Sequence, residues 1–154
     1  MRKPNKMVGI LLIGGIILIQ FFQPERNLGT VETENALVTV TRAPDNLAAI
    51  LKNSCYDCHS NRTVYPWYSY ISPLSWFLEK HIQEGKEALN MSEFGTLEKN
   101  QKIGVLADIC DVIESGSMPL QSYLIIHKSA LVQENDKEAI CSWSESEALK
   151  IMRE

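Results

Sequence analysis

The sequence predicts an all-α domain of about four helices, preceded by a short apolar helix at the N-terminus. Apolar residues recur at intervals of three and four in separate stretches, and this spacing places them on one face of an α-helix. Serine, proline and glycine residues lie between the stretches, as is common where helices begin and end. The regular alternation of strands and helices that indicates a βαβ fold is missing from the sequence.

Basic residues and then apolar residues begin the chain. Arg2, Lys3 and Lys6 precede an apolar run of about 16 residues, which is short for a membrane span. No small-x-small cleavage site follows the run. We therefore expect residues 1–22 to be an uncleaved signal anchor in the cytoplasmic membrane, with the rest of the chain on the periplasmic side. A cleaved signal peptide, which would release the domain into the periplasm, is the alternative.

Residues 23–43 show no strong period, and we expect them to be a tether that contains a short extended segment. The apolar residues of that segment are Val31, Leu37, Val38 and Val40. One domain is then expected to occupy residues 44–154.

The first helix of the domain is expected to begin at Pro44 or Asp45 and to end at His59, before the break at residues 60–61. The second should begin with Ser72 as N-cap and Pro73 as its first residue, and end near residue 90. Its apolar stripe consists of Leu74, Phe77, Leu78, His81, Ile82, Gly85, Ala88 and Leu89. Because His81 belongs to this stripe, its side chain should face the interior.

Two more helices are expected, from about Thr96 to Glu114 and from about Glu134 to Met152. Gly116 is the expected C-terminal cap after the third helix. The apolar sides of the two helices consist of Val105, Leu106, Ile109, Cys110, Val112 and Ile113, and of Ile140, Trp143, Ala148 and Ile151.

The pentapeptide Cys55-Tyr56-Asp57-Cys58-His59 has the C-x-x-C-H spacing of c-type haem attachment. Two thiols three positions apart at the end of a helix can each add to one vinyl group of a porphyrin. The adjacent His59 can then supply an axial nitrogen to the iron. The spacing therefore predicts one covalent haem c on Cys55 and Cys58, with His59 as the proximal iron ligand.

A dithiol redox pair and a zinc site are the competing interpretations of the pentapeptide. A redox C-x-x-C pair is typical of a thioredoxin-like βαβ setting, which this sequence lacks. A structural zinc site needs a fourth ligand, usually from a second pair of cysteines or histidines. Cys110 and Cys141 are too isolated in the sequence to supply that pair. Haem is therefore favoured over both.

The sixth iron ligand is the main choice that the sequence leaves open. Met118 follows a helix end and precedes a proline, so its thioether lies on a short loop, and a thioether opposite histidine suits an electron carrier. His81 is the alternative distal ligand and would give a bis-histidine site. His127 is a third candidate, which we would sooner expect as a hydrogen-bond partner of the haem edge or of the backbone. An open sixth position is the remaining alternative.

The segment from residue 61 to residue 72 is rich in aromatic residues. Flat, weakly polar rings such as those of Tyr65 and Trp67 suit the face and edge of a porphyrin, although ordinary core packing explains them nearly as well. Arg62 is a candidate partner for a haem propionate, and an exposed, unpaired side chain is its alternative state.

Cys110 and Cys141 lie on the apolar sides of the helices that flank the Met118 loop. In an oxidising compartment such a pair favours a disulfide, and two buried free thiols are the alternative. A bridge closing a loop of this size would stabilise the fold by roughly 3–4 kcal/mol in the chain-entropy model.

Charge limits the classes of partner. The chain carries 15 basic and 19 acidic residues, and three of the basic ones precede the apolar run. An acidic domain argues against nucleic acid as a partner. It is compatible with a basic redox partner protein that is attracted electrostatically, and also with an ordinary solvated surface.

Several segments resemble a family of small haem-binding domains found in exported bacterial proteins, and the resemblance covers about two-thirds of the chain. The matching residues are those at positions 54–63, 65–68, 71–76, 85–90 and 118–123, with His127, Ile140 and Trp143. The resemblance implies covalent haem on Cys55 and Cys58 with His59 axial. By analogy with class I cytochromes c it implies Met118 as the distal ligand. Leu120 departs from the pattern, since many members have a second proline there.

Together these observations predict a cytochrome c-like bundle around a covalent haem, in a membrane-anchored periplasmic monohaem cytochrome that transfers single electrons. No Ser-His-Asp array, phosphate loop or catalytic carboxylate pair is visible, so we expect a carrier rather than an enzyme. A peroxidase-like haem enzyme and a haem-based gas or redox sensor are the alternatives. Both would use an open or displaceable sixth position.

Overall fold

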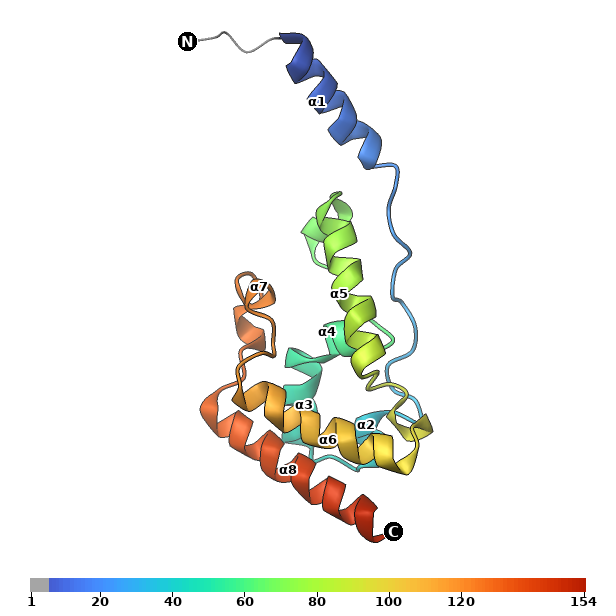
Figure 1. Cartoon of the computed structure of the whole chain (residues 1–154), viewed down its shortest axis with the longest axis vertical. Coiled ribbons are helices and arrows are strands. Elements are labelled where there is room, and N and C mark those ends of the chain that lie inside the picture. The colour runs from blue at the N-terminus through green and yellow to red at the C-terminus, as the bar shows by residue number, and fades with distance from the viewer. Residues whose placement is uncertain (1–5) are drawn as a thin grey trace.

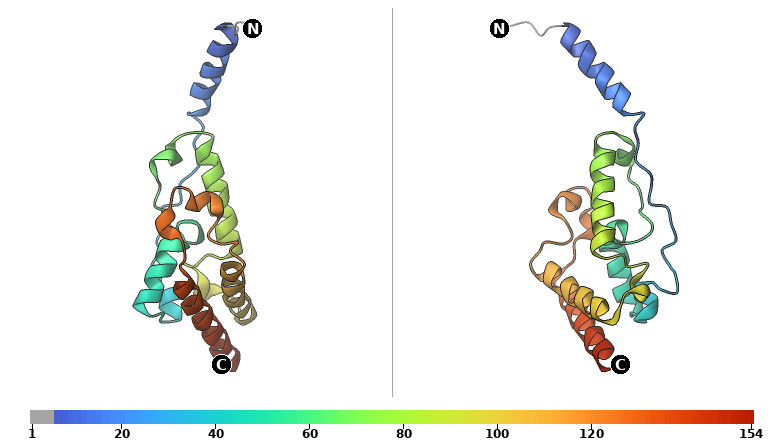
Figure 2. Two further views of the ribbon diagram at one scale, coloured as in Figure 1. Left: turned by 90° about the vertical axis from the view of Figure 1, so that its left-hand side faces the viewer. Right: turned by 45° about the vertical axis from the view of Figure 1, so that its right-hand side comes forward.

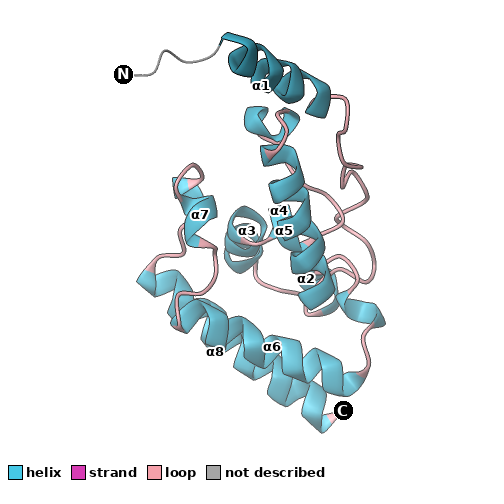
Figure 3. Ribbon diagram, turned by 45° about the horizontal axis from the view of Figure 1, so that its top comes forward, coloured by secondary structure: helices cyan, strands magenta, loops and turns pink. Residues whose placement is uncertain are grey.

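The computed structural model describes residues 6–154, so Arg2 and Lys3 of the predicted anchor lie outside the described residues. Every regular element in this range is helical, apart from one isolated bridge between Leu28 and Arg62 (Figure 3). The all-α prediction is therefore confirmed for the described chain. Apart from the N-terminal helix, four helices are ten residues or longer, namely α3, α5, α6 and α8.

Helix α1 (Lys6–Ile19) extends away from the other helices and buries none of its residues against them (Figure 1). Its sequence is apolar on all sides after Lys6. In the described range, no helix has both the length and the apolar character needed to cross a membrane.

The segment that follows α1 runs back beside α5 and leads into a short helix, α2 (Leu37–Val40) (Figure 2). Ala36 and Leu37 are fully buried, and the amide of Leu37 donates to the carbonyl of Met91 at 2.7 Å. The predicted extended segment is therefore wrong. A helical turn replaces it because burying Leu37 against the domain brings the chain into a compact bend. This part of the predicted tether belongs to the core.

The first predicted helix is broken in two at Cys55, into α3 (Asp45–Ser54) and α4 (Tyr56–His59). Leu47 and Leu51 on α3 are buried as expected. Cys55 has left the helical conformation, yet its carbonyl still accepts the amide of His59 at 2.9 Å. Because of this break, Cys55 lies between the two helices, and Cys58 and His59 lie on a separate short turn, α4.

Helix α5 (Leu74–Ala88) follows a 3-10 turn, η1 (Trp67–Tyr70). It begins one residue later than predicted, and Ser72 is not its N-cap. The hydroxyl of Ser72 instead lies 3.2 Å from that of Ser75 and accepts a hydrogen bond from Gln23, because the preceding chain packs against this end of the helix. The predicted stripe is also only partly buried, since Ile82 and Gly85 are buried while Leu74 and Phe77 are exposed.

Helices α6 (Lys99–Glu114) and α8 (Glu134–Arg153) lie side by side and antiparallel at the opposite end of the molecule (Figure 1). A 3-10 turn, η2 (Phe94–Thr96), precedes α6, so this helix begins three residues later than predicted. Glu98 forms a capping box with Gln101 at its start. The two helices are connected through α7 (Gln121–Leu124) and a 3-10 turn, η3 (Lys128–Ala130).

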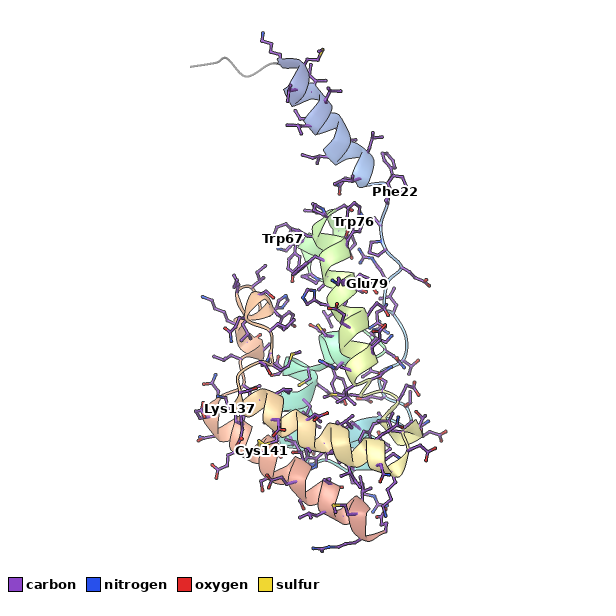
Figure 4. All side chains as sticks on the ribbon, in the orientation of Figure 1. Phe22, Trp67, Trp76, Glu79, Lys137 and Cys141 are labelled. Atoms are coloured by element: carbon purple, nitrogen blue, oxygen red, sulfur yellow. A yellow bond between two sulfur atoms is a disulfide. The ribbon has the colours of Figure 1, made fainter. Side chains whose placement is uncertain are left out.

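A disulfide joins Cys110 of α6 to Cys141 of α8, with the two Cα atoms 4.7 Å apart (Figure 4). It lies beside one core formed by α2, α3, α6, α8 and the η2 turn. The fully buried apolar side chains of this core are Phe94, Leu37, Leu51, Leu106 and Ile140. The disulfide therefore fixes the two helices from which the Met118 loop leaves and to which it returns.

Candidate functional site

Two adjoining cavities lie beside α4, with volumes of about 230 Å³ and about 260 Å³. The first is bounded by α4, by the inner side of α5 and by the Met118 loop. The second continues from it toward α6. Both are lined by Ser54, Cys55, His59, Ala88, Met118 and Pro119. The cysteine turn and the methionine loop, which are far apart in the sequence, therefore form walls of the same space.

Cys55 and Cys58 are free thiols, in contrast to the bridged pair on α6 and α8. Burial, and then the proximity of Cys58, raises the pKa of the Cys55 thiol to about 12. Burial, and then the charge of Asp57, raises the pKa of the Cys58 thiol to about 11. Both thiols are consequently protonated at neutral pH, which makes them weak nucleophiles without an activating partner.

His59 is held by backbone on both sides. Its Nδ1 lies 3.0 Å from the carbonyl oxygen of Leu89, and its own carbonyl accepts the amide of Met91 at 2.7 Å. A carbonyl can only accept, so the proton of the neutral ring belongs on Nδ1 and the lone pair on Nε2. Burial lowers the pKa of His59, and hydrogen bonds from the ring to the backbone of Leu89 and Gly85 oppose this effect. The ring is therefore neutral and oriented, as an iron-ligating imidazole requires.

Gly85 is the point of closest approach between α5 and the cysteine turn. A Cβ atom at this position would lie 2.7 Å from the carbonyl oxygen of Cys58 and 3.2 Å from its Cβ. Only glycine allows the helix to pack directly on this backbone. The contact determines the distance between α5, which carries His81 and Ala88, and the two thiols.

Asp57, between the two cysteines, connects the turn to the loop on the other side of the cavity. One of its carboxylate oxygens accepts the amide of Val64 at 3.0 Å, and the other accepts the phenol of Tyr123 at 2.7 Å. Burial and this hydrogen bond raise the pKa of Tyr123 well above its usual value, so the phenol keeps its proton. Tyr123 follows Met118 by one short turn and thus holds the methionine loop against the cysteine turn.

Met118 is half-buried and lines both cavities together with His59. Its amide donates to the carbonyl of Val112 at 3.0 Å, which fixes the loop to the end of α6. Gly116 takes a φ of 69° just before it, the left-handed conformation expected of a helix-ending glycine. The thioether is therefore carried by a loop that is fastened at both ends.

The other two candidate ligands occupy different places. His81 lines the first cavity, and its ring packs on that of Phe77 with centroids 4.2 Å apart. His127 lines neither described cavity, and instead its ring stacks on Tyr123 at 4.2 Å with its Nε2 2.9 Å from the phenol oxygen of Tyr68. His127 thereby supports the ring that holds the Met118 loop.

Three side chains considered for haem packing lie away from the two described cavities. The phenol of Tyr65 accepts the amide of Asn27 at 2.7 Å and contacts Glu79, so Tyr65 holds the N-terminal segment. Trp67 is exposed, and its ring meets that of Tyr68 edge to face. Arg62 is exposed as well and pairs through its backbone with Leu28.

Sequence reasoning missed Gly85 as a packing contact and the pair of Asp57 and Tyr123. The sequence identifies Gly85 only as a member of the apolar stripe. Tyr123 stands five positions after Met118, and its closeness in sequence to a candidate ligand is the one signal that pointed to it. Neither contact follows from a local pattern, because each joins residues that are distant in the chain.

We expect Gly85→Ala to weaken the site, because the added methyl group must displace α5 or the cysteine turn. Overpacking of this kind costs about 1–3 kcal/mol. The free energy of unfolding and the rate of alkylation of Cys58 in the haem-free protein would measure the effect. Gly104→Ala on α6 is the matched control, since a Cβ there meets no atom within 4 Å. Equal free energies of unfolding and equal alkylation rates in the two variants would show that the contact at Gly85 has room for a methyl group.

We expect Tyr123→Phe to loosen the Met118 loop by removing the hydrogen bond to Asp57, at a cost of roughly 1–3 kcal/mol. Hydrogen exchange of residues 118–127 would then be faster, while exchange in α8 would not change. Tyr70→Phe is the control, because Tyr70 is exposed and outside the site. Unchanged exchange in the loop would contradict the role given to the phenol.

Comparison with known protein families gives a match over most of the chain. A family described as "Haem-binding domain" matches residues 14–146, which is most of the chain. Neither the curated proteins nor the solved structures gave a match. The matched range contains the cysteine turn, α5, the Met118 loop and most of α8. The chain therefore belongs to the haem-binding domain family.

Proposed function

We propose that this haem-binding protein carries one haem c, attached covalently through Cys55 and Cys58, and that it transfers single electrons. The observation that carries the proposal is the arrangement around one space of two free thiols, an oriented neutral imidazole and a thioether. These are the donor groups of a His/Met cytochrome site. A bound haem would supply reversible one-electron chemistry at its iron.

The side chains of the site fit such a group. Cys55 and Cys58 would hold the group covalently, each through a bond from its sulfur to one vinyl carbon, with the thiol hydrogen going to the other vinyl carbon. Nε2 of His59 is free to bind the iron, because Nδ1 is engaged by the Leu89 carbonyl. Met118 is the proposed distal ligand, and it shares both cavities with His59. His81 shares only the first, which makes it the second choice.

Apolar residues of α6 line the second cavity, among them Val105, Ile109, Val112 and Ile113. Such walls keep water from an iron site and favour the less charged oxidation state. Only positioning and exclusion of water are required of the chain, and we propose a carrier rather than an enzyme.

The proposed setting is the periplasmic side of the cytoplasmic membrane. The support is the apolar helix α1 after a basic start, together with the export that c-type attachment needs. The proposed partner is a basic redox protein, attracted by the excess of acidic residues, and nucleic acid is not proposed as a partner.

Attachment is tested on full-length protein produced with the haem-attachment machinery. Haem should stay with the chain through denaturing electrophoresis, and the Cys55→Ser/Cys58→Ser variant should lose it, because no thioether can form. Ser54→Ala, at the adjacent cavity-lining residue, is the control and should retain haem. Haem that is extracted from the unaltered protein by acid and organic solvent would overturn covalent attachment while leaving haem binding intact.

The distal ligand is tested by spectroscopy of the ferric protein. With Met118 bound, the spectrum should be low-spin and contain the methionine-to-iron charge-transfer band, and Met118→Ala should remove this band. His81→Ala should leave it unchanged. A band that survives in Met118→Ala would contradict the assignment, and loss of the low-spin spectrum in His81→Ala would favour a bis-histidine site. A high-spin iron in the unaltered protein would point to an open sixth position, as in a peroxidase or sensor.

A further inference from the structure

An uncharged aromatic surface forms the end of the molecule nearest to α1. We call it the aromatic tip, and it consists of the η1 turn and the beginning of α5, with the two phenylalanines that follow α1. Trp67 is 75% exposed and Phe22 is 70% exposed, although both are large apolar residues. The other exposed side chains of the tip are Phe21, Tyr70, Ile71, Leu74, Trp76 and Phe77.

The residues that form the tip are themselves uncharged, although the guanidinium of Arg26 lies over the ring of Tyr70. No Asp, Glu, Lys or Arg occurs between Arg62 and Glu79, whereas acidic residues are frequent on α6 and α8. A soluble surface rarely gathers this many exposed apolar side chains without a partner. Tryptophan and tyrosine in particular favour the boundary between water and lipid, because they combine an apolar ring with a polar group.

The end of α1 is fastened to this tip by hydrogen bonds. Gln20 donates to the carbonyl of Ser72 at 3.0 Å and accepts its amide at 2.9 Å. The indole of Trp76 donates to the carbonyl of Phe22 at 2.6 Å, and Figure 4 shows the two residues beside each other where α1 ends.

A second attachment lies further along the chain. The guanidinium of Arg26 lies over the rings of Tyr65 and Tyr70, at 4.7 Å and 3.8 Å from their centroids. The segment that follows α1 is therefore attached to the tip at several points, and the helix cannot separate freely from it.

We propose that the aromatic tip lies in the interfacial layer of the same lipid membrane that takes up α1. The inference rests on the proposed membrane attachment of α1 and goes beyond it, because the domain itself would contact lipid. Lipid is the expected partner because the tip adjoins α1. Helix α1 is apolar on all sides, and the tip begins where α1 ends. The acidic helices α6 and α8 would face away from an anionic lipid surface (Figure 1).

This placement of the tip would also determine how far the haem site lies from the membrane. Gly85 lies eleven positions beyond Leu74 on α5, and a helix rises 1.5 Å per residue, so the cysteine turn would lie on the order of 16 Å along α5 from the membrane surface. A rigid helix would keep this distance constant. The redox partner would then meet the haem site close to the membrane.

The test uses the full, haem-loaded chain in vesicles of phosphatidylethanolamine and phosphatidylglycerol that contain a photoreactive phospholipid. After irradiation, mass spectrometry should find lipid adducts on residues 6–22 and on residues 63–78, and none on α6 or α8. Adducts on residues 6–22 alone would overturn the inference and leave the anchor standing. The absence of adducts on both would overturn membrane attachment as well. Haem content, measured separately, tests the haem proposal independently.

Substitutions at the tip make the test specific. Trp67→Gln/Leu74→Gln should give several-fold fewer adducts on residues 63–78, with adducts on residues 6–22 unchanged. Leu149→Gln/Met152→Gln on α8 is the matched control, since both residues are similarly exposed and remote from the tip. Equal labelling in the two variants would contradict the proposal. In a separate reaction with a bifunctional protein crosslinker, links between two tips in the absence of lipid adducts would assign this surface to a second copy of the chain.

Discussion

The direct packing of Gly85 on the backbone of Cys58 is the contact on which the site depends. Because no side chain separates them, α5 and the cysteine turn share one wall of the first cavity. The end of the same helix supplies the Leu89 carbonyl that orients His59, and Met91 just beyond it donates to the backbone of His59. A larger residue at position 85 would disturb the thiols and the imidazole together.

The Met118 loop forms the other wall of the cavity and is held in place differently. The Met118 loop has no helix of its own to hold it, and it is fixed by contacts at its two ends. Val112 binds the amide of Met118, the disulfide clamps α6 to α8, and Asp57 binds Tyr123 across the cavity. A residue inside the C-x-x-C-H motif thus helps to position the candidate distal ligand. The motif does not specify which residues occupy its two x positions. In this protein one of them, Asp57, binds Tyr123 and so helps to hold the Met118 loop.

The two cysteine pairs have different fates for a physical reason. Cys110 and Cys141 face each other from antiparallel helices, so a bridge forms across the interface. Cys55 and Cys58 flank one short turn at a cavity and remain free thiols. The free pair stands beside an oriented imidazole, and this combination supports the proposed thioether attachment. The aromatic tip at the other end of α5 supports a location at the membrane surface. The two proposals together would place a haem site at a fixed distance from the lipid surface.

Local patterns in the sequence determined much of this protein: the all-helical fold, the approximate positions of the long helices, the C-x-x-C-H turn and the pairing of Cys110 with Cys141. Each depends on residues a few positions apart or on rare residue types, and both can be recognised in a single sequence. Tertiary structure alone decided that Leu37 is buried in a helical turn, that Gly85 touches Cys58 and that Tyr123 binds Asp57. It also decided that Tyr65 and Trp67 serve the N-terminal segment and the tip rather than the cavities. These outcomes depend on contacts between distant segments, and such contacts leave no periodic trace in the sequence.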